Sequence, residues 1–287
     1  MGNLYAFVGP AGSTHLVLVQ LDQALQDALG QYFDIYEEQF LNGVDEYIGF
    51  DGGYSPDPNQ LLQMPLTQEM QTFIAEMDLG AVGREVYDPD QIAIEDLRAL
   101  AWFKNENGSS RVLLQNFTRG QAISRKIAIM FTGETFRRLE EPSIIIGNHL
   151  DGIIRNGNFH FRSFNIAKRI FDLHEVYREA TDNDIQNFAA NGNILIQDMD
   201  AFLTKANATQ RKLIFSVQTS GVLTQKTAHE INALAQGMDI DIPLDNGRIS
   251  LTHGASLTNI LKFLDNSLYR SPINQQRYIA NSRRRIG

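Results

Sequence analysis

The stretch from Arg98 to Phe117 reads RALAWFK, then NENGSS, then RVLLQNF, and it decides the fold class. Two runs of aliphatic and aromatic residues flank a connection, Asn105 to Ser109, that consists of turn-forming residues. Apolar runs of this length around an Asn-Gly turn are typical of a β-hairpin. The sequence therefore predicts two antiparallel strands, Arg98 to Lys104 and Arg111 to Phe117.

Two further pairs of apolar segments are separated by glycine-containing turns and predict more hairpins. They are Leu4 to Val8 with Leu16 to Leu21, and Ile144 to Ile154 with Asn158 to Phe161. A helical pattern runs from Asp22 to Phe40, and another from Thr67 to Glu76. Asp57-Pro58 is a helix start signal, because Asp caps helices well and Pro suits the first turn.

After residue 165 the pattern becomes mostly helical. The expected helices are 165–178, 182–189, 208–218, 225–236, 257–268 and 272–285, with one strand near 248–251. We therefore predict an α+β fold in which a strand-and-helix N-terminal part precedes a helix-rich C-terminal part. The expected regions are 1–141 and 142–287, with Pro142 at the boundary.

Composition excludes several classes of protein. The 287 residues include no Cys, which excludes disulfides, thiol nucleophiles and cysteine-ligated zinc. The apolar runs are far shorter than the roughly 20 residues that span a bilayer. Met1 to Gly9 lacks the features of a signal peptide. We expect a cytoplasmic protein.

Charge is distributed unevenly along the chain. The first 90 residues contain fifteen acidic residues and one basic residue, Arg84. The rest contains nineteen acidic and twenty-four basic residues. An acidic section is repelled from phosphate, so a nucleic-acid surface is expected only after residue 90. Charge complementarity within one fold or one oligomer would give the same asymmetry.

Catalytic motifs are weak. Gly9 to Thr14 follows a strand but lacks the Gly-Lys of a phosphate-binding loop, so we interpret it as a turn. The histidines show no metal-ligand spacing, and we expect no catalytic residue, metal or cofactor. A divalent-metal nuclease stays as an alternative, with Asp90 and Asp96 as its carboxylates and Arg98 where a Lys is usual.

Basic residues after position 120 are the candidate DNA contacts. On the expected C-terminal helix, Arg277, Arg284 and Arg285 fall in one sector, opposite Ile279 and Ile286. A helix cap or solubilising tail is the alternative explanation for this sector. Further candidates lie upstream, and they are Arg125, Lys126, Arg155, Arg162, Lys168 and Arg169. Three nearby aromatic residues, Phe159, Phe161 and Phe164, are expected in the core.

The C-terminal part resembles a known family. Residues 265–273 (DNSLYRSPI), Tyr278 and 282–284 (SRR) are similar to the ending of KwaB-like proteins of the Kiwa anti-phage defence system. The likeness extends upstream through residues 136–139, 144–161, 169–173 and 181–185, so it covers roughly residues 95–287.

This resemblance implies a DNA-binding effector that impedes phage DNA replication or transcription. It also implies a membrane-spanning KwaA-like partner subunit, through which the chain is recruited to the inner membrane, and we expect a homo-oligomer. A structural adaptor for that membrane subunit is a second alternative. The form of nucleic acid, duplex or single-stranded, stays open.

Overall fold

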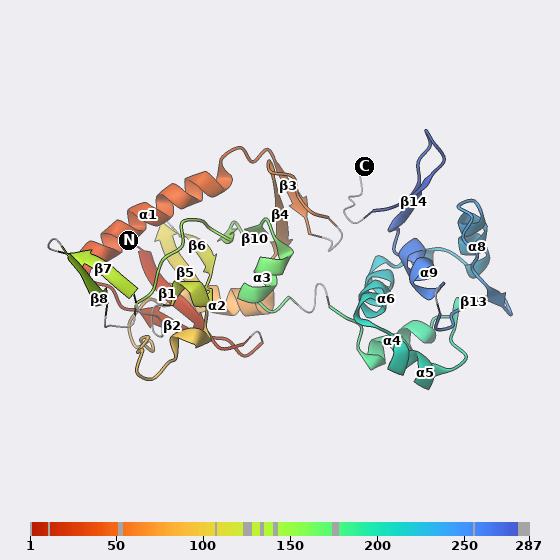
Figure 1. The fold of residues 1–287 in the computed structure, drawn as a ribbon, viewed down its shortest axis with the longest axis horizontal. Coiled ribbons are helices and arrows are strands. Elements are labelled where there is room, and N and C mark those ends of the chain that lie inside the picture. Colours follow the sequence, from red (N-terminus) through yellow and green to blue (C-terminus); the bar gives the residue numbers. More distant parts are fainter. Residues whose placement is uncertain are drawn as a thin grey trace. The chain divides into compact units, whose positions relative to one another are not determined.

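The structure is a computed structural model that describes residues 2–10, 12–50, 54–106, 108–122, 128–132, 135–139, 143–173, 178–254 and 256–280. The chain forms two compact units (Figure 1). Unit 1 comprises residues 1–51 and 55–172, and unit 2 comprises 52–54 and 173–287. Strands dominate unit 1 and helices dominate unit 2. The predicted α+β class is confirmed.

An eight-stranded sheet forms the body of unit 1, in the order β2-β1-β5-β6-β9-β10-β4-β3. Neighbouring strands are antiparallel except β3 and β4, which are parallel. The strands are β1 (Gly2–Val8), β2 (His15–Val19), β3 (Glu46–Gly49), β4 (Gln60–Pro65), β5 (Leu97–Glu106), β6 (Ser109–Asn116), β9 (Gly152–Arg155) and β10 (Asn158–Phe161). A separate two-stranded sheet pairs β7 (Ala128–Thr132) with β8 (Thr135–Leu139).

The three predicted hairpins are all present, as β1-β2, β5-β6 and β9-β10. Since β1 pairs with β2 on one side and β5 on the other, the acidic first 90 residues supply interior strands of the sheet. They are part of unit 1 and not a separable domain.

Helices cover both faces of this sheet. Helix α1 (Gln23–Leu41), capped by the Asp22 carboxylate, packs against β1, and its Phe33 ring stacks on Trp102 at 5.3 Å between centroids. Helix α2 (Gln68–Asp78) and helix α3 (Phe164–Ile170) pack against β6, α3 also against β5. An aromatic layer lies beneath them, in which Phe7 contacts Phe73 and Phe171. Phe159 and Phe161 are fully buried in the core, as predicted, whereas Phe164 is only half-buried.

Unit 2 has its own hydrophobic core, which includes Ile185, Phe202, Ile214 and Ile260. Its helices are α4 (Asp182–Ala189), α5 (Met199–Lys205), α6 (Ala208–Ser220), α7 (Val222–Gln225), α8 (Ala228–Gln236) and α9 (Leu257–Leu264). A small sheet joins β11 (Ile194–Leu195), β12 (Leu244–Asp245) and β13 (Arg248–Ser250). No helix in the described ranges is long and apolar enough to cross a membrane.

Local capping explains why the helices of unit 2 begin where they do. Thr181 and Asp184 form a capping box at the start of α4, and Asn207 with Gln210 does the same for α6. The Arg178 guanidinium beside Asp184 holds the pKa of that carboxyl well below its usual range. The start of α4 is therefore fixed by both a cap and an ion pair.

Tertiary pairing overrides some local signals. The helix predicted at Asp57-Pro58 is wrong, because the strand β4 follows, with its buried side chains paired across to β3 and β10. The helix predicted from 165 ends at Ile170, and Phe171 is buried in extended backbone. The two compact units divide near residue 172, since β9 pairs with β6 and β10 pairs with β4 in the sheet of unit 1.

The C-terminal helix predicted for 272–285 is also wrong over its described part. Residues 268–270 and 277–279 form the antiparallel strands β14 (Leu268–Arg270) and β15 (Arg277–Ile279). Ser271-Pro272 begins a turn, which closes with a hydrogen bond from Ser271 N–H to the Gln276 carbonyl, while Gln275 has a positive φ. Proline at position 272 is compatible with a tight turn as well as with the first turn of a helix, so the local sequence did not distinguish the two structures.

Candidate nucleic-acid interface

The structure describes five of the nine predicted DNA contacts. Arg125, Lys126, Arg284 and Arg285 lie outside the described residues. Arg155, Arg162, Lys168 and Arg169 belong to unit 1, and Arg277 belongs to unit 2. Arg155 and Arg162 stand at opposite ends of the β9-β10 hairpin. The described candidates therefore do not form one continuous cluster.

Arg162 serves a structural role. Its Nη1 donates hydrogen bonds to the carbonyl oxygens of Pro58 (2.6 Å) and Gln60 (3.3 Å), and its Nη2 donates to the Phe40 carbonyl (3.0 Å). The guanidinium also lies 5.5 Å from the Phe40 ring centroid. These contacts join the end of α1 to the segment before β4. Most of its donor capacity is used inside unit 1.

Arg155 is partly engaged. Its Nη2 donates to the Tyr47 hydroxyl at 2.6 Å, and its guanidinium lies over the Tyr47 ring at 5.6 Å. Arg155 lies next to the turn of the β9-β10 hairpin, and Tyr47 is on the edge strand β3. Neither contact neutralises the arginine charge, so Arg155 keeps a positive group at this corner.

Lys168 and Arg169 are the most available of the four unit 1 candidates. Both are exposed in the last turn of α3, where the helix dipole favours cations. The Lys168 ammonium lies 5.9 Å from the Phe164 ring centroid. Within the part of the chain that the structure describes, the Arg169 guanidinium makes no hydrogen bond or ion pair, although its backbone carbonyl accepts from Arg98 Nε. Neither side chain would have to break a hydrogen bond or ion pair with the described residues in order to contact a phosphate.

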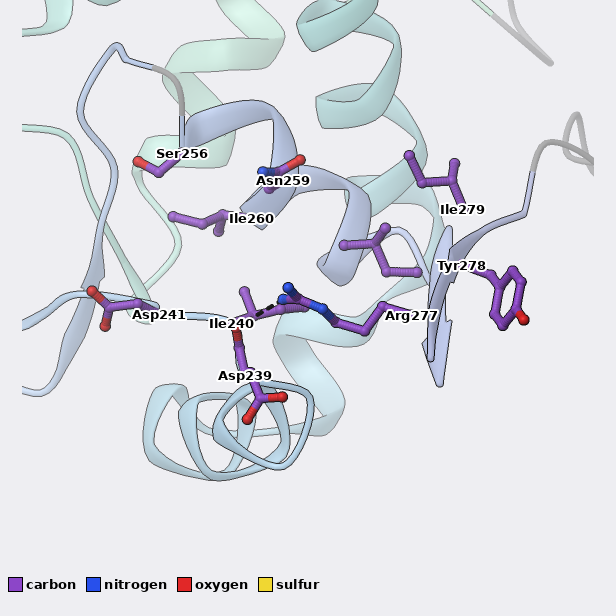
Figure 2. Close-up of a pocket in the computed structure, with 10 residues that line it drawn as sticks. Asp239, Ile240, Asp241, Ser256, Asn259, Ile260, Arg277, Tyr278 and Ile279 are labelled. Carbon is purple, nitrogen blue, oxygen red and sulfur yellow. Dashed lines mark hydrogen bonds between the residues drawn. The ribbon is translucent and has the colours of Figure 1, made fainter. Parts of the chain in front are cut away.

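Arg277 lies on the hairpin of unit 2, beside a hollow of about 310 Å³ (Figure 2). Its Nη1 donates to the carbonyl oxygens of Asp239 (2.9 Å) and Met238 (3.4 Å). Apolar side chains that include Ile240 and Ile260 line the hollow from the loop after α8 and from α9. Arg277 thus anchors the hairpin to the end of α8, and its contacts are carbonyl oxygens.

A second hollow, of about 470 Å³, was missed by sequence reasoning. The buried Asp151 carboxylate accepts from Asn116 N–H at 2.7 Å and lies 3.5 Å from His149 Nε2. Burial raises the pKa of Asp151, while the hydrogen bond from Asn116 and the charge of His149 act against that shift. Arg162 lines the same hollow. The only local signal was the spacing of His149 and Asp151, on the segment that leads into β9.

The carboxylates of the nuclease alternative lie in different local structures. Asp90 is exposed in a turn, where its N–H donates to Asp88 Oδ1. Asp96 ends a short 3-10 helix (Ile94–Asp96) directly before β5. The Arg98 side chain is bound to the Arg169 carbonyl and the Thr14 hydroxyl. Among the described residues no three His, Asp or Glu side chains gather into a possible metal site.

Comparison with known proteins decides the family. The family model described as Kiwa protein KwaB-like matches residues 114–274, more than half of the chain. The chain belongs to the KwaB-like family. It is therefore a component of the Kiwa anti-phage defence. No curated protein and no solved structure matches it. The match runs from β6 to the turn between β14 and β15, so the KwaB-like region includes parts of both units.

Proposed function

We propose that this KwaB-like chain is a non-catalytic DNA-binding effector that impedes replication or transcription of phage DNA. The observation that carries the proposal is the exposed cationic end of α3. Among the residues that the structure describes, no carboxylate pairs with Lys168 or Arg169, whereas Arg84, the one basic residue of the first 90, is paired with Glu76 at 2.9 Å. Charge that is not neutralised internally remains available for phosphates.

The test is a salt titration of binding to duplex and single-stranded DNA, with Mg²⁺ present so that cleavage is also seen. Lys168→Gln with Arg169→Gln should weaken binding to all sequences alike. The slope of log affinity against log salt should shrink by about 0.9 per lost contact on duplex DNA. A matched control is Lys205→Gln with Lys226→Gln, which removes two exposed cations of unit 2.

The outcomes separate this function from its alternatives. Equal slopes for the α3 variant, its control and the unchanged protein would contradict a DNA contact at α3. Magnesium-dependent cleavage would favour the nuclease. Association with the membrane subunit, without any DNA binding at low salt, would favour the structural adaptor.

The partner in this proposal is a membrane-spanning KwaA-like subunit, which recruits the chain to the inner membrane. Its basic cytoplasmic loops would meet acidic residues of the first 90 positions, which include fifteen acidic residues and one basic residue. Leu79 and Val82 are apolar residues of the same part of the chain, and they are 81% and 96% exposed in the loop after α2. Replacing the exposed Glu38 and Glu85 by their amides should weaken recruitment most at low salt. Unchanged recruitment would locate the partner contact elsewhere.

A homo-oligomer completes the proposal. Two or more copies at the membrane would multiply the number of phosphate contacts and raise avidity without any new contact type. Light scattering of the purified protein gives the number of copies, and a single copy at working concentration would contradict this part.

A further inference from the structure

The β14-β15 hairpin has two unlike faces. Side chains alternate along a strand, and residues directly opposite each other on paired strands share a face. The paired positions are Leu268 with Ile279, Tyr269 with Tyr278, and Arg270 with Arg277. One face therefore carries the two tyrosines, and the other carries the arginines and the aliphatic residues.

The arginine face is directed toward the body of unit 2. Arg270 forms an ion pair with Asp239, and Arg277 donates to the Asp239 carbonyl. Leu268 and Ile279 line the hollow beside α9. Figure 2 shows Arg277 reaching toward Asp239, while the Tyr278 ring points away from the hollow. Because the arginine face is held against the body of unit 2, the two tyrosines lie on the opposite face of the hairpin.

The tyrosine face is an ordered aromatic surface. The two rings stack with their centroids 5.4 Å apart and their planes 20° apart. Tyr269 is 48% exposed and Tyr278 is 37% exposed. The Tyr278 hydroxyl accepts a hydrogen bond from Asn274 Nδ2 at 2.7 Å, which fixes the ring. These large apolar rings face solvent in a fixed orientation.

The same stretch of sequence is strongly basic. Residues 266–287 contain five arginines and no acidic residue. Asp239 neutralises Arg270, whereas the hydrogen bonds of Arg277 go to carbonyl oxygens. An aromatic surface within a basic segment is the combination by which proteins hold single-stranded nucleic acid, because bases stack on the rings and cations contact the phosphates.

We propose that the Tyr269–Tyr278 face stacks with unpaired bases of single-stranded DNA. The proposal rests on the proposed DNA binding and adds the form of nucleic acid that unit 2 recognises. In a duplex the faces of the bases are covered by neighbouring base pairs, so exposed tyrosine rings can stack only where the strand is open.

The experiment compares the full-length protein with Tyr269→Thr combined with Tyr278→Thr, using an oligo(dT) strand and a duplex of equal length. Threonine keeps strand propensity and cross-strand pairing but removes both rings. The matched control is Ile273→Thr, which removes a 94% exposed apolar side chain from the same hairpin and keeps the rings. Circular dichroism checks that each variant is folded.

We expect the double variant to lose about five-fold to a hundred-fold in affinity for oligo(dT) for each stacked base. Affinity for the duplex should change little, and Ile273→Thr should bind both as the unchanged protein does. A strand containing 2-aminopurine gives a second measurement, since its emission should change on stacking when the unchanged protein binds.

Two results would overturn the inference while leaving DNA binding intact. One is an oligo(dT) affinity that does not depend on the rings. The other is an unchanged 2-aminopurine emission on binding, which counts even if the double variant fails to fold. Absence of binding to either DNA at low salt would refute the proposed function as well. Loss of membrane recruitment by the double variant, with DNA binding retained, would assign the tyrosines to a protein partner.

Discussion

Replacing Arg162 by Met should destabilise unit 1 without acting on DNA binding directly. Met keeps an apolar stem but removes the donors that reach the carbonyl oxygens of Phe40, Pro58 and Gln60. Hydrogen bonds from charged donors contribute about 1.5–3 kcal/mol each when buried, and less where water can replace them. The cation–π contact with Phe40 adds about 0.5–1 kcal/mol.

Arg162 is only partly buried and its 3.3 Å contact is long, so the sum is discounted. We expect the free energy of unfolding of unit 1 to fall by about 2–4 kcal/mol. For a unit of this size the melting temperature should decrease by roughly 4–16 °C, at about 2–4 °C per kcal/mol.

Urea unfolding followed by tryptophan fluorescence measures this change in unit 1 alone. Trp102 is the one tryptophan of the sequence. It belongs to β5, stacks on Phe33 of α1 and is 1% exposed. Its fluorescence reports the unfolding of unit 1, so the unfolding curve can be fitted without assuming that both units unfold in one transition. Lys168→Gln and Arg169→Gln are the controls, and each should stay within about 0.5 kcal/mol of the unchanged protein. An Arg162→Met protein of unchanged stability but reduced salt dependence of DNA binding would refute the reasoning.

Three further outcomes are expected. Gly152→Ala would place a Cβ 2.5 Å from the Phe159 ring, so the same urea experiment should show a loss of about 1–3 kcal/mol, and unchanged stability would mean the ring moves freely. The depressed pKa of Asp184 stabilises the fold above about pH 4 and less below it, so the destabilisation by Asp184→Asn should be largest near pH 7 and shrink as pH falls; a pH-independent difference in melting temperature would count against the ion pair. Asp90→Asn with Asp96→Asn should leave anti-phage protection in a plaque assay unchanged, whereas loss of protection with DNA binding retained would promote the nuclease.

Elements with strong local signals were predictable. The apolar runs around Asn105 to Ser109 gave the β5-β6 hairpin, because cross-strand pairing there needs only neighbouring residues. Helix α4 was placed at 182–189 in agreement with the structure, since Thr181 and Asp184 form the capping box within one turn.

The candidate site was less predictable, because the partners of a long side chain are distant in sequence. Arg162 and Arg169 look equivalent as basic residues, yet Arg162 is held by carbonyl oxygens about a hundred residues away. No spacing rule contains that information. His149 and Asp151 likewise line a hollow only because α1, which is distant in sequence, forms another of its sides.

The sequence by itself determined the α+β class, the separation of acidic and basic sections and the position of the β1-β2, β5-β6 and β9-β10 hairpins, since these depend on composition and near neighbours. Tertiary structure decided where the units divide, because β9 pairs with β6 and β10 pairs with β4 in the same eight-stranded sheet. It also decided the form of the C-terminal segment. Stacking of Tyr269 on Tyr278 and anchoring of Arg277 to the end of α8 accompany a hairpin, whereas the local pattern alone suited a helix.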